Sequence, residues 1–109
     1  MTYQVKISEQ AKTDLRGIYE YIAFTLLSPK NASKLLSTLE KKILSLENFP
    51  KRFKLYHDEL WHDQELRVMP VNNFLIFYIY DNKNQIVTIL RIMYCGRDIP
   101  NELHNSKFN

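Results

Sequence analysis

Residues 74–98 constrain the fold of this chain more than any other stretch. Two runs rich in aromatic and β-branched residues, 74–80 and 86–94, flank the polar break Asp81-Asn82-Lys83-Asn84-Gln85. This composition predicts two antiparallel strands of a half-buried sheet, joined by a hairpin turn. The rest of the chain must then pack on this hairpin or extend from its ends.

The second of these strands carries a charged residue at an apolar position. Arg91 alternates with Val87, Ile89 and Met93, so the pattern predicts that the four residues share one face of the sheet. A cation there must reach a partner or the solvent, and we expect a structural ion pair. Beyond the strand, Gly96 permits a sharp exit that sets Arg97 at the rim of the sheet, where functional side chains commonly lie.

Length and composition limit what the chain can be. With 109 residues, 45% of them hydrophobic, the sequence supports one core and shows no linker. It has no apolar stretch of about 18 residues and no signal-peptide pattern, so we expect a cytoplasmic protein without a membrane segment. A single cysteine, Cys95, excludes an internal disulfide and a thiolate zinc site, and we expect it to be a small buried side chain. The net charge of +3 favours anionic partners without requiring one.

Two helices are predicted before residue 50. After a short alternating strand at residues 3–7, Ser8 fits a helix N-cap and the first helix runs to about Leu27. Gly17 weakens this helix by about 1 kcal/mol relative to alanine, which we interpret as close packing against the next helix. Ser28-Pro29 is a second start signal.

The second helix ends before Phe49-Pro50. Because the break between the two helices is short, we expect an antiparallel pair on one face of the sheet. The apolar stripe of the second helix is Ala32, Leu35, Leu36, Leu39, Ile43 and Leu46.

Residues 51–65 have no clear period and are predicted to form a surface loop with one helical turn, anchored by Phe53 and Trp61. The segment contains side chains of the kinds that bind metals, but their spacing fits no closed site, so no metal is expected. Those side chains are His57, Asp58, His62 and Asp63.

The remaining segments complete the sheet and the tail. Residues 66–71 are predicted to be a third strand, with Pro70 on an edge or at a bulge because proline cannot donate to a ladder. A tight turn at Asn72-Asn73 then gives an antiparallel meander with the central hairpin. The tail, residues 100–109, is predicted to be polar and frayed apart from Leu103 and Phe108.

The predicted order is β-α-α-β-β-β, an α+β fold in which a two-helix hairpin packs on one face of an antiparallel sheet. Within this order stand Val5-Lys6-Ile7-Ser8, Tyr19-Glu20-Tyr21-Ile22, Phe49-Pro50, Leu66-Arg67, Asn73-Phe74-Leu75-Ile76-Phe77-Tyr78, Ile89-Leu90-Arg91-Ile92 and Gly96-Arg97-Asp98-Ile99. With these residues the chain resembles the RelE/ParE superfamily of bacterial toxins from type II toxin-antitoxin modules. The resemblance implies one toxin domain over residues 1–99, followed by a polar tail at 100–109.

The resemblance implies one of two targets. RelE-like members cut messenger RNA on the ribosome, and ParE-like members poison DNA gyrase. Metal-independent RNA cleavage needs proton transfer and fixed cations around the phosphate, so no cofactor is expected. If the chain is a ribonuclease, the resemblance assigns catalysis to Arg67, Arg97 and Tyr94, with His104 a weaker candidate in the tail.

The ribonuclease set is incomplete, because Leu75 stands where RelE-like enzymes carry an arginine on the third strand. Lys51, Arg52 and Lys54 would bind and steer a nucleic-acid backbone in such an enzyme. Arginines at strand rims also commonly pair with nearby acids, so a structural role for Arg67 or Arg97 stays open.

We therefore favour a ParE-like growth inhibitor acting on DNA gyrase. A RelE-like, ribosome-dependent messenger RNA endoribonuclease and a non-toxic binding module that keeps the fold are the alternatives. The expected partner is a cognate antitoxin, whose acidic and partly disordered segment would fold over the first helix and the loop after the second.

Overall fold

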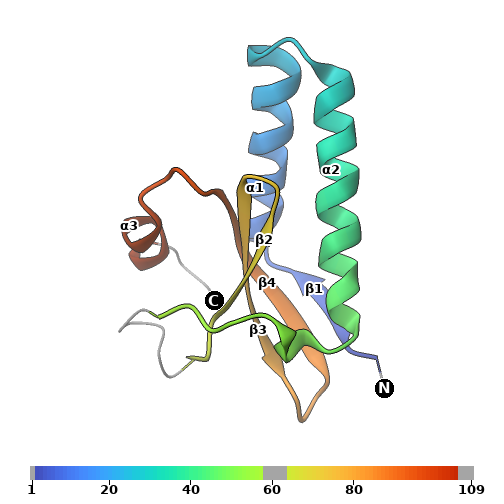
Figure 1. Ribbon diagram of the computed structural model, residues 1–109, viewed down its shortest axis with the longest axis vertical. Helices are drawn as coiled ribbons and strands as arrows, with labels where there is room; N and C mark the ends of the chain where they lie inside the picture. The colour runs from blue at the N-terminus through green and yellow to red at the C-terminus, as the bar shows by residue number, and fades with distance from the viewer. Residues whose placement is uncertain (1, 58–63, 106–109) are drawn as a thin grey trace.

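A four-stranded sheet carries a long helical hairpin on one face and a short C-terminal helix on the other (Figure 1). The computed structural model describes residues 2–57 and 64–105. The helices are α1 (Glu9–Glu20), α2 (Pro29–Leu44) and α3 (Ile99–His104), and a π-helical turn, η1 (Tyr21–Thr25), extends α1. The strands are β1 (Gln4–Ile7), β2 (Arg67–Val71), β3 (Phe74–Asp81) and β4 (Ile86–Tyr94).

The predicted α+β class and its β-α-α-β-β-β order are confirmed, but the sheet is mixed. The strand order is β1-β4-β3-β2, and β2, β3 and β4 form the expected antiparallel meander. β1 pairs in parallel with β4, so the prediction of an antiparallel sheet is wrong for this pair. Parallel neighbours need a long crossover, and here the helical hairpin together with β2 and β3 provides it. Pro70 lies on the edge strand β2, as predicted.

A β-bulge in β4 changes which face its residues occupy. Phe77 pairs with Arg91 and Tyr78 pairs with Ile89, which leaves Leu90 as the extra residue. Because of this insertion Ile89 packs on the helical side, whereas Met93 packs on the opposite side. The prediction that Arg91 shares one continuous face with Val87, Ile89 and Met93 is therefore wrong.

Both faces of the sheet are covered by apolar side chains. On the helical side, Leu39 and Ile43 of α2 pack against Met69, Ile76 and other residues of the strands. On the opposite side, Ile99 and Leu103 of α3 pack against a second cluster: Leu66, Val68, Phe77, Leu90 and Met93.

The predicted helix starts are confirmed. The Ser8 Oγ accepts a hydrogen bond from the Ala11 N–H at 3.0 Å and donates one to the Leu90 carbonyl at 3.0 Å, which ties the start of α1 to the bulge. α2 begins at Pro29, although the Ser28 hydroxyl bonds the side chain of Asn31 at 2.6 Å rather than a backbone N–H.

Two predictions about the residues after β4 are wrong. Residues 99–104 form α3 with Asp98 as its N-cap, so this part of the tail is not frayed. Leu103, which is excepted from that prediction, is almost completely buried. Cys95 is exposed because β4 ends at Tyr94 and Cys95 belongs to the turn that follows. Phe108 lies outside the described residues.

The segment after α2 is short and irregular. A 3-10 turn, η2 (Ser45–Glu47), ends α2, and a second, η3 (Pro50–Arg52), supplies the single helical turn predicted within residues 51–65. Phe53 packs against the helical-side core as predicted. The other anchor, Trp61, and the side chains of Asp58, His62 and Asp63 lie outside the described residues. None of the helices in residues 2–57 and 64–105 has both the length and the apolar character needed to cross a membrane.

Candidate functional site

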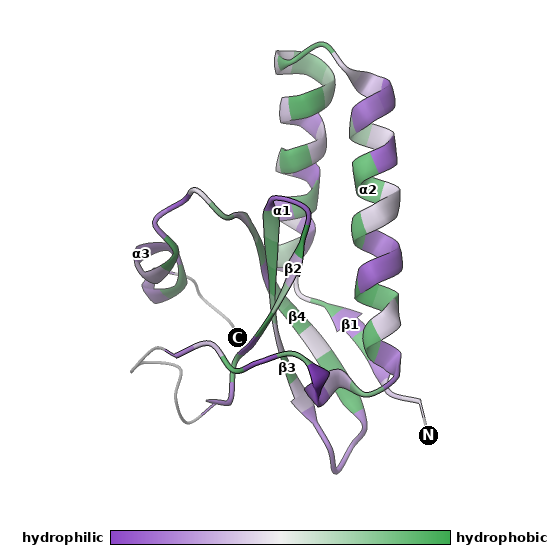
Figure 2. Cartoon of the chain, in the orientation of Figure 1, coloured by the Kyte–Doolittle hydropathy of each residue, from purple (hydrophilic) through white to green (hydrophobic). Residues whose placement is uncertain are grey.

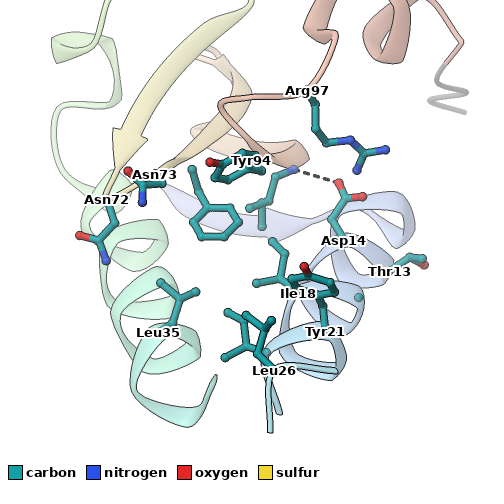
Figure 3. A pocket seen from close by; sticks show the side chains of 14 residues that line it. Thr13, Asp14, Ile18, Tyr21, Leu26, Leu35, Asn72, Asn73, Tyr94 and Arg97 are labelled. Atoms are coloured by element: carbon teal, nitrogen blue, oxygen red, sulfur yellow. Dashed lines mark hydrogen bonds between the residues drawn. The ribbon is translucent and has the colours of Figure 1, made fainter. Parts of the chain in front are cut away.

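The helical hairpin projects beyond the end of the sheet (Figure 1). A groove lies beneath the hairpin. The groove has a volume of about 920 Å³ and lies between the hairpin and the end of the sheet where β2 and β3 are joined. Figure 3 shows Ile18, Tyr21 and Leu26 on the hairpin side and Tyr94 and Arg97 on the sheet side. We refer to it as the hairpin groove.

The offset of the hairpin from the sheet and one glycine keep this groove open. The joined ends of the two helices extend past the end of the sheet (Figure 1). Gly17 lines the groove, and a Cβ atom built there meets nothing within 4 Å. Gly17 therefore faces open space, and the prediction that it packs closely against the second helix is wrong.

The end of the helical hairpin is unusually apolar for an exposed surface. Phe24 is 68% exposed and Leu27 is 82% exposed, and Tyr21 and Leu26 are more than half exposed. Figure 2 shows hydrophobic residues at the turn that joins α1 to α2. Contiguous exposed apolar surface of this kind marks an interaction site. We call Tyr21, Phe24, Leu26 and Leu27 the apolar tip.

Tyr94 and Arg97, two of the predicted site residues, border the hairpin groove together. The Tyr94 ring meets Phe74 edge to face, with 5.9 Å between centroids, and half of the Tyr94 side chain is exposed. A Cβ at Gly96 would lie 2.5 Å from the Tyr94 ring, so glycine allows the ring to lie over the turn. Arg97 donates to the Glu102 Oε1 of α3 at 2.6 Å.

Asp14, Arg91 and Glu102 form an ionic network next to the residues that border the groove. Arg91 Nε donates to Asp14 Oδ2 at 2.8 Å, and the two side chains are only 6% and 8% exposed. The same Asp14 oxygen accepts the Ile92 backbone N–H at 2.9 Å, the bond drawn in Figure 3. Arg91 also approaches Glu102 of α3 at 3.7 Å. The predicted structural ion pair of Arg91 is confirmed, and it links β4 with α1 and α3.

Arg67, the third predicted catalytic residue, lies at the other end of the sheet. Arg67 is the first residue of β2. Tyr94 pairs with Phe74, and Phe74 pairs with Val71, the last residue of β2. Arg67 is therefore four residue steps, or about 13 Å, along the strands from the level of Tyr94. The structure therefore brings Tyr94 and Arg97 together but does not bring Arg67 to them.

Arg67 instead holds the loop that follows α2. Its Nη1 donates to the carbonyls of Lys51 at 3.1 Å and Phe53 at 2.6 Å, and its guanidinium lies 5.4 Å from the centre of the Tyr80 ring. The Tyr78 hydroxyl donates to the Pro50 carbonyl in the same loop. Burial raises the pKa of Tyr78 to about 12, although Arg67 and Arg52 act in the opposite direction. This hydroxyl therefore stays protonated and keeps donating at neutral pH.

The predicted nucleic-acid-binding residues lie around the same loop. Lys51, Arg52 and Lys54 are all exposed, and Arg52 folds back to donate to the Asn48 carbonyl at 2.5 Å. His104 is exposed in the last turn of α3 and does not line the hairpin groove. The roles of these residues stay predictions.

The hairpin groove itself was not predicted. Its signal was the run Tyr21-Ile22-Ala23-Phe24-Thr25-Leu26-Leu27, which is apolar at the junction of two helices where a polar turn is usual. Such a run indicates that the junction contacts something other than water.

Known proteins share both the sequence pattern and the fold. Residues 5–99 match the family model described as the ParE toxin of the type II toxin-antitoxin system, parDE. A search of the curated proteins gave no match.

Solved structures of toxins resemble this chain closely in fold. A structure titled as the chromosomal ParDE system of P. aeruginosa has a TM-score of 0.70 at 19% identity, covering 85% of this chain and 96% of that one. The RelBE2 toxin-antitoxin complex of Mycobacterium tuberculosis gives a TM-score of 0.65 at 20% identity, with 86% and 92% covered. A variant of the E. coli toxin RelE in the free state gives 0.62 at 12% identity, with 94% and 93% covered.

These structures establish the fold, and the family match, which extends from β1 to the first residue of α3, establishes the lineage. The chain belongs to the ParE toxin family of type II toxin-antitoxin systems.

Proposed function

We propose that this chain is a cytoplasmic protein that inhibits bacterial growth by acting on DNA gyrase, and that a cognate antitoxin neutralises it. The match of residues 5–99 to the ParE toxin family carries the proposal. The geometry supports the gyrase branch over the ribonuclease branch, because Arg67 is committed to backbone carbonyls about 13 Å along the sheet from Tyr94. General acid-base chemistry needs its groups within hydrogen-bond reach of one reacting phosphate.

Induction of the chain in bacteria tests the target. We expect growth arrest, together with gyrase-dependent linearisation of plasmid DNA and intact translated messages. Cleavage of translated messages with intact plasmid would instead support a RelE-like nuclease. Normal growth on confirmed expression of the folded chain would support the non-toxic binding module.

The hairpin groove is the surface that we propose for the antitoxin. Two of the similar structures are of a ParDE system and of a toxin-antitoxin complex, which supports a partner of the same kind here. The groove offers apolar side chains along its length and a cation, Arg97, at its rim. An amphipathic acidic segment that folds into it would bury the apolar tip and place carboxylates near Arg97.

Gly17 allows this surface to be tested without damage to the core. In Gly17→Leu the new side chain enters the groove, and we expect the variant to stay folded and toxic but to escape neutralisation by the co-expressed antitoxin. Gly17→Ala adds only a Cβ, to which nothing lies within 4 Å, and should be neutralised normally. Leu44→Ser removes an exposed apolar side chain outside the groove and serves as a second control. Normal neutralisation of Gly17→Leu would exclude the groove as the docking surface.

A further inference from the structure

A second hollow lies at the opposite end of the sheet, beside the turn at residues 48–53. Its volume is about 480 Å³, within the usual range for small-ligand pockets. The groups that line it are of two main kinds, aromatic rings and side-chain amides: Tyr3, Phe49 and Tyr80, and Asn48, Asn82 and Gln85. No acidic side chain is found among the described residues that line it. We call it the Phe49 pocket.

Phe49 is held in a conformation that its side chain does not favour. Its φ is 49° and its ψ is 58°, in the left-handed region, and its ring is 79% exposed. Such a conformation in a bulky residue costs free energy and persists only where the surroundings impose it. The left-handed backbone would favour glycine at this position, and the phenylalanine ring is not buried. Packing therefore does not explain why phenylalanine is present, and the exposed ring needs another explanation.

Three side chains impose this conformation on the turn. Arg52 donates to the carbonyls of Asn48 at 2.5 Å and Phe49 at 3.3 Å, and to the Ser45 Oγ at 2.9 Å. Arg67 and the Tyr78 hydroxyl donate to further carbonyls of the same turn. The aromatic ring is thus presented by a rigid support before any ligand arrives, which lowers the ordering cost of binding.

The chemistry of the pocket fits a nucleobase with its phosphate. An exposed aromatic ring is a stacking platform for any base. The Tyr3 hydroxyl donates to Asn82 Oδ1 at 2.5 Å, which orients this amide and leaves its Nδ2 to donate to a base edge. Lys51 lines the pocket, so a cation lies where a backbone phosphate would follow the base.

The nearest carboxylate of the β3–β4 turn does not oppose an anionic ligand. Asp81 accepts from the backbone N–H groups of Lys83 at 3.0 Å and Asn84 at 3.1 Å, and from the Asn84 side chain at 2.6 Å. Asp81 is not among the residues that line the pocket. The Asp81 carboxylate is therefore hydrogen-bonded within its own turn and does not face the pocket.

We propose that the Phe49 pocket binds a base of single-stranded nucleic acid, stacked on Phe49 and flanked by Lys51. The site lies at the end of the sheet away from the hairpin groove and does not depend on the target proposed above. Lys51, which is predicted from the sequence to bind nucleic acid, lines this pocket. Arg67, which is predicted to be catalytic, instead supports the turn that carries Phe49.

Fluorescence anisotropy with labelled RNA and DNA 8-mers and the purified full-length chain tests the proposal. Wild-type protein should bind both, more weakly as salt increases, and Phe49→Gly should weaken binding roughly tenfold or more through loss of stacking. Glycine relaxes the left-handed backbone, so this variant should fold at least as well as the wild type. Phe49→Trp should retain binding.

Matched controls separate this pocket from other exposed surface. Phe24→Ala removes an exposed ring (68% exposed, against 79% for Phe49) from the apolar tip and should leave the affinity unchanged. Lys51→Ala should reduce the slope of log affinity against log salt by about 0.7. Absence of oligonucleotide binding by the wild type, or equal affinity of Phe49→Gly and wild type, would overturn the proposal. Neither result bears on growth arrest, so the proposed function stands or fails separately.

Discussion

We expect substitution of Asp14 to lower the free energy of unfolding strongly. Its carboxylate accepts from Arg91 Nε at 2.8 Å, from Arg91 Nη2 at 3.1 Å and from the Ile92 N–H at 2.9 Å. In Asp14→Asn the shape is kept and one oxygen can still accept the backbone N–H. The negative charge that faces the buried guanidinium is lost.

The magnitude follows from the burial of the pair. Removing one partner of a buried ion pair costs about 3–5 kcal/mol, because the remaining charge stays desolvated. Here Glu102 lies 3.7 Å from Arg91 and retains part of the compensation, so we expect about 3 kcal/mol. Against a typical domain stability of roughly 5–15 kcal/mol, this is a large share.

Urea denaturation followed by circular dichroism measures the effect. Asp14→Asn should shift the midpoint strongly without changing the slope, whereas Glu102→Gln, at a more exposed position, should cost about 1 kcal/mol. The double variant Asp14→Asn with Arg91→Met removes the stranded cation and should be more stable than Asp14→Asn alone. If the costs of the two substitutions simply add, the buried charge is not the source of the instability, and the reasoning is wrong.

Three further predictions concern stability, each measured by denaturant or thermal unfolding. Gly17→Ala should stabilise the chain by about 1 kcal/mol, because helix propensity improves and the added Cβ meets open space; destabilisation would show that Gly17 has a packing role. Ser8→Ala should cost about 1 kcal/mol through loss of the cap that also holds the Leu90 carbonyl, and Thr13→Ala, an exposed position on the same helix, should cost less. The raised pKa of Tyr78 means that this side chain ionises first in the unfolded chain, near pH 10, so its contribution to stability should be constant below pH 10 and fall between pH 10 and pH 12. In Tyr78→Phe this part of the alkaline loss should disappear, and an unchanged alkaline profile would contradict the assignment to Tyr78.

The strands and helices could be predicted from the sequence because their signals are local. The polar break at residues 81–85 between two β-rich runs fixed the hairpin, and Ser8 and Pro29 marked helix starts that the structure confirms. The third helix also has a local signal in the sequence. Asp98 is a good N-cap, Pro100 is tolerated in a first turn, and Ile99 and Leu103 are spaced to share a helical face.

The contacts that define the sites could not be predicted, because they join residues far apart in the chain. Arg91 needed a partner, but its partner is 77 positions away, and no local rule selects Asp14. Arg67 and Arg97 resembled one cationic site because both stand at strand ends. Only the register of the sheet shows that these are opposite ends. The hairpin groove likewise depends on how far the helical hairpin extends past the sheet, which is a property of the assembled elements.

The parallel pairing of β1 with β4 has a consequence for how the protein is made. The partner of residues 4–7 is residues 86–89, so the first strand synthesised waits for nearly the whole chain before its ladder can close. Contacts of such long sequence separation form late and slow folding. A ribosome must therefore release most of this polypeptide before the finished sheet exists, and a translation product cut short before residue 86 has no partner strand for its own N-terminus.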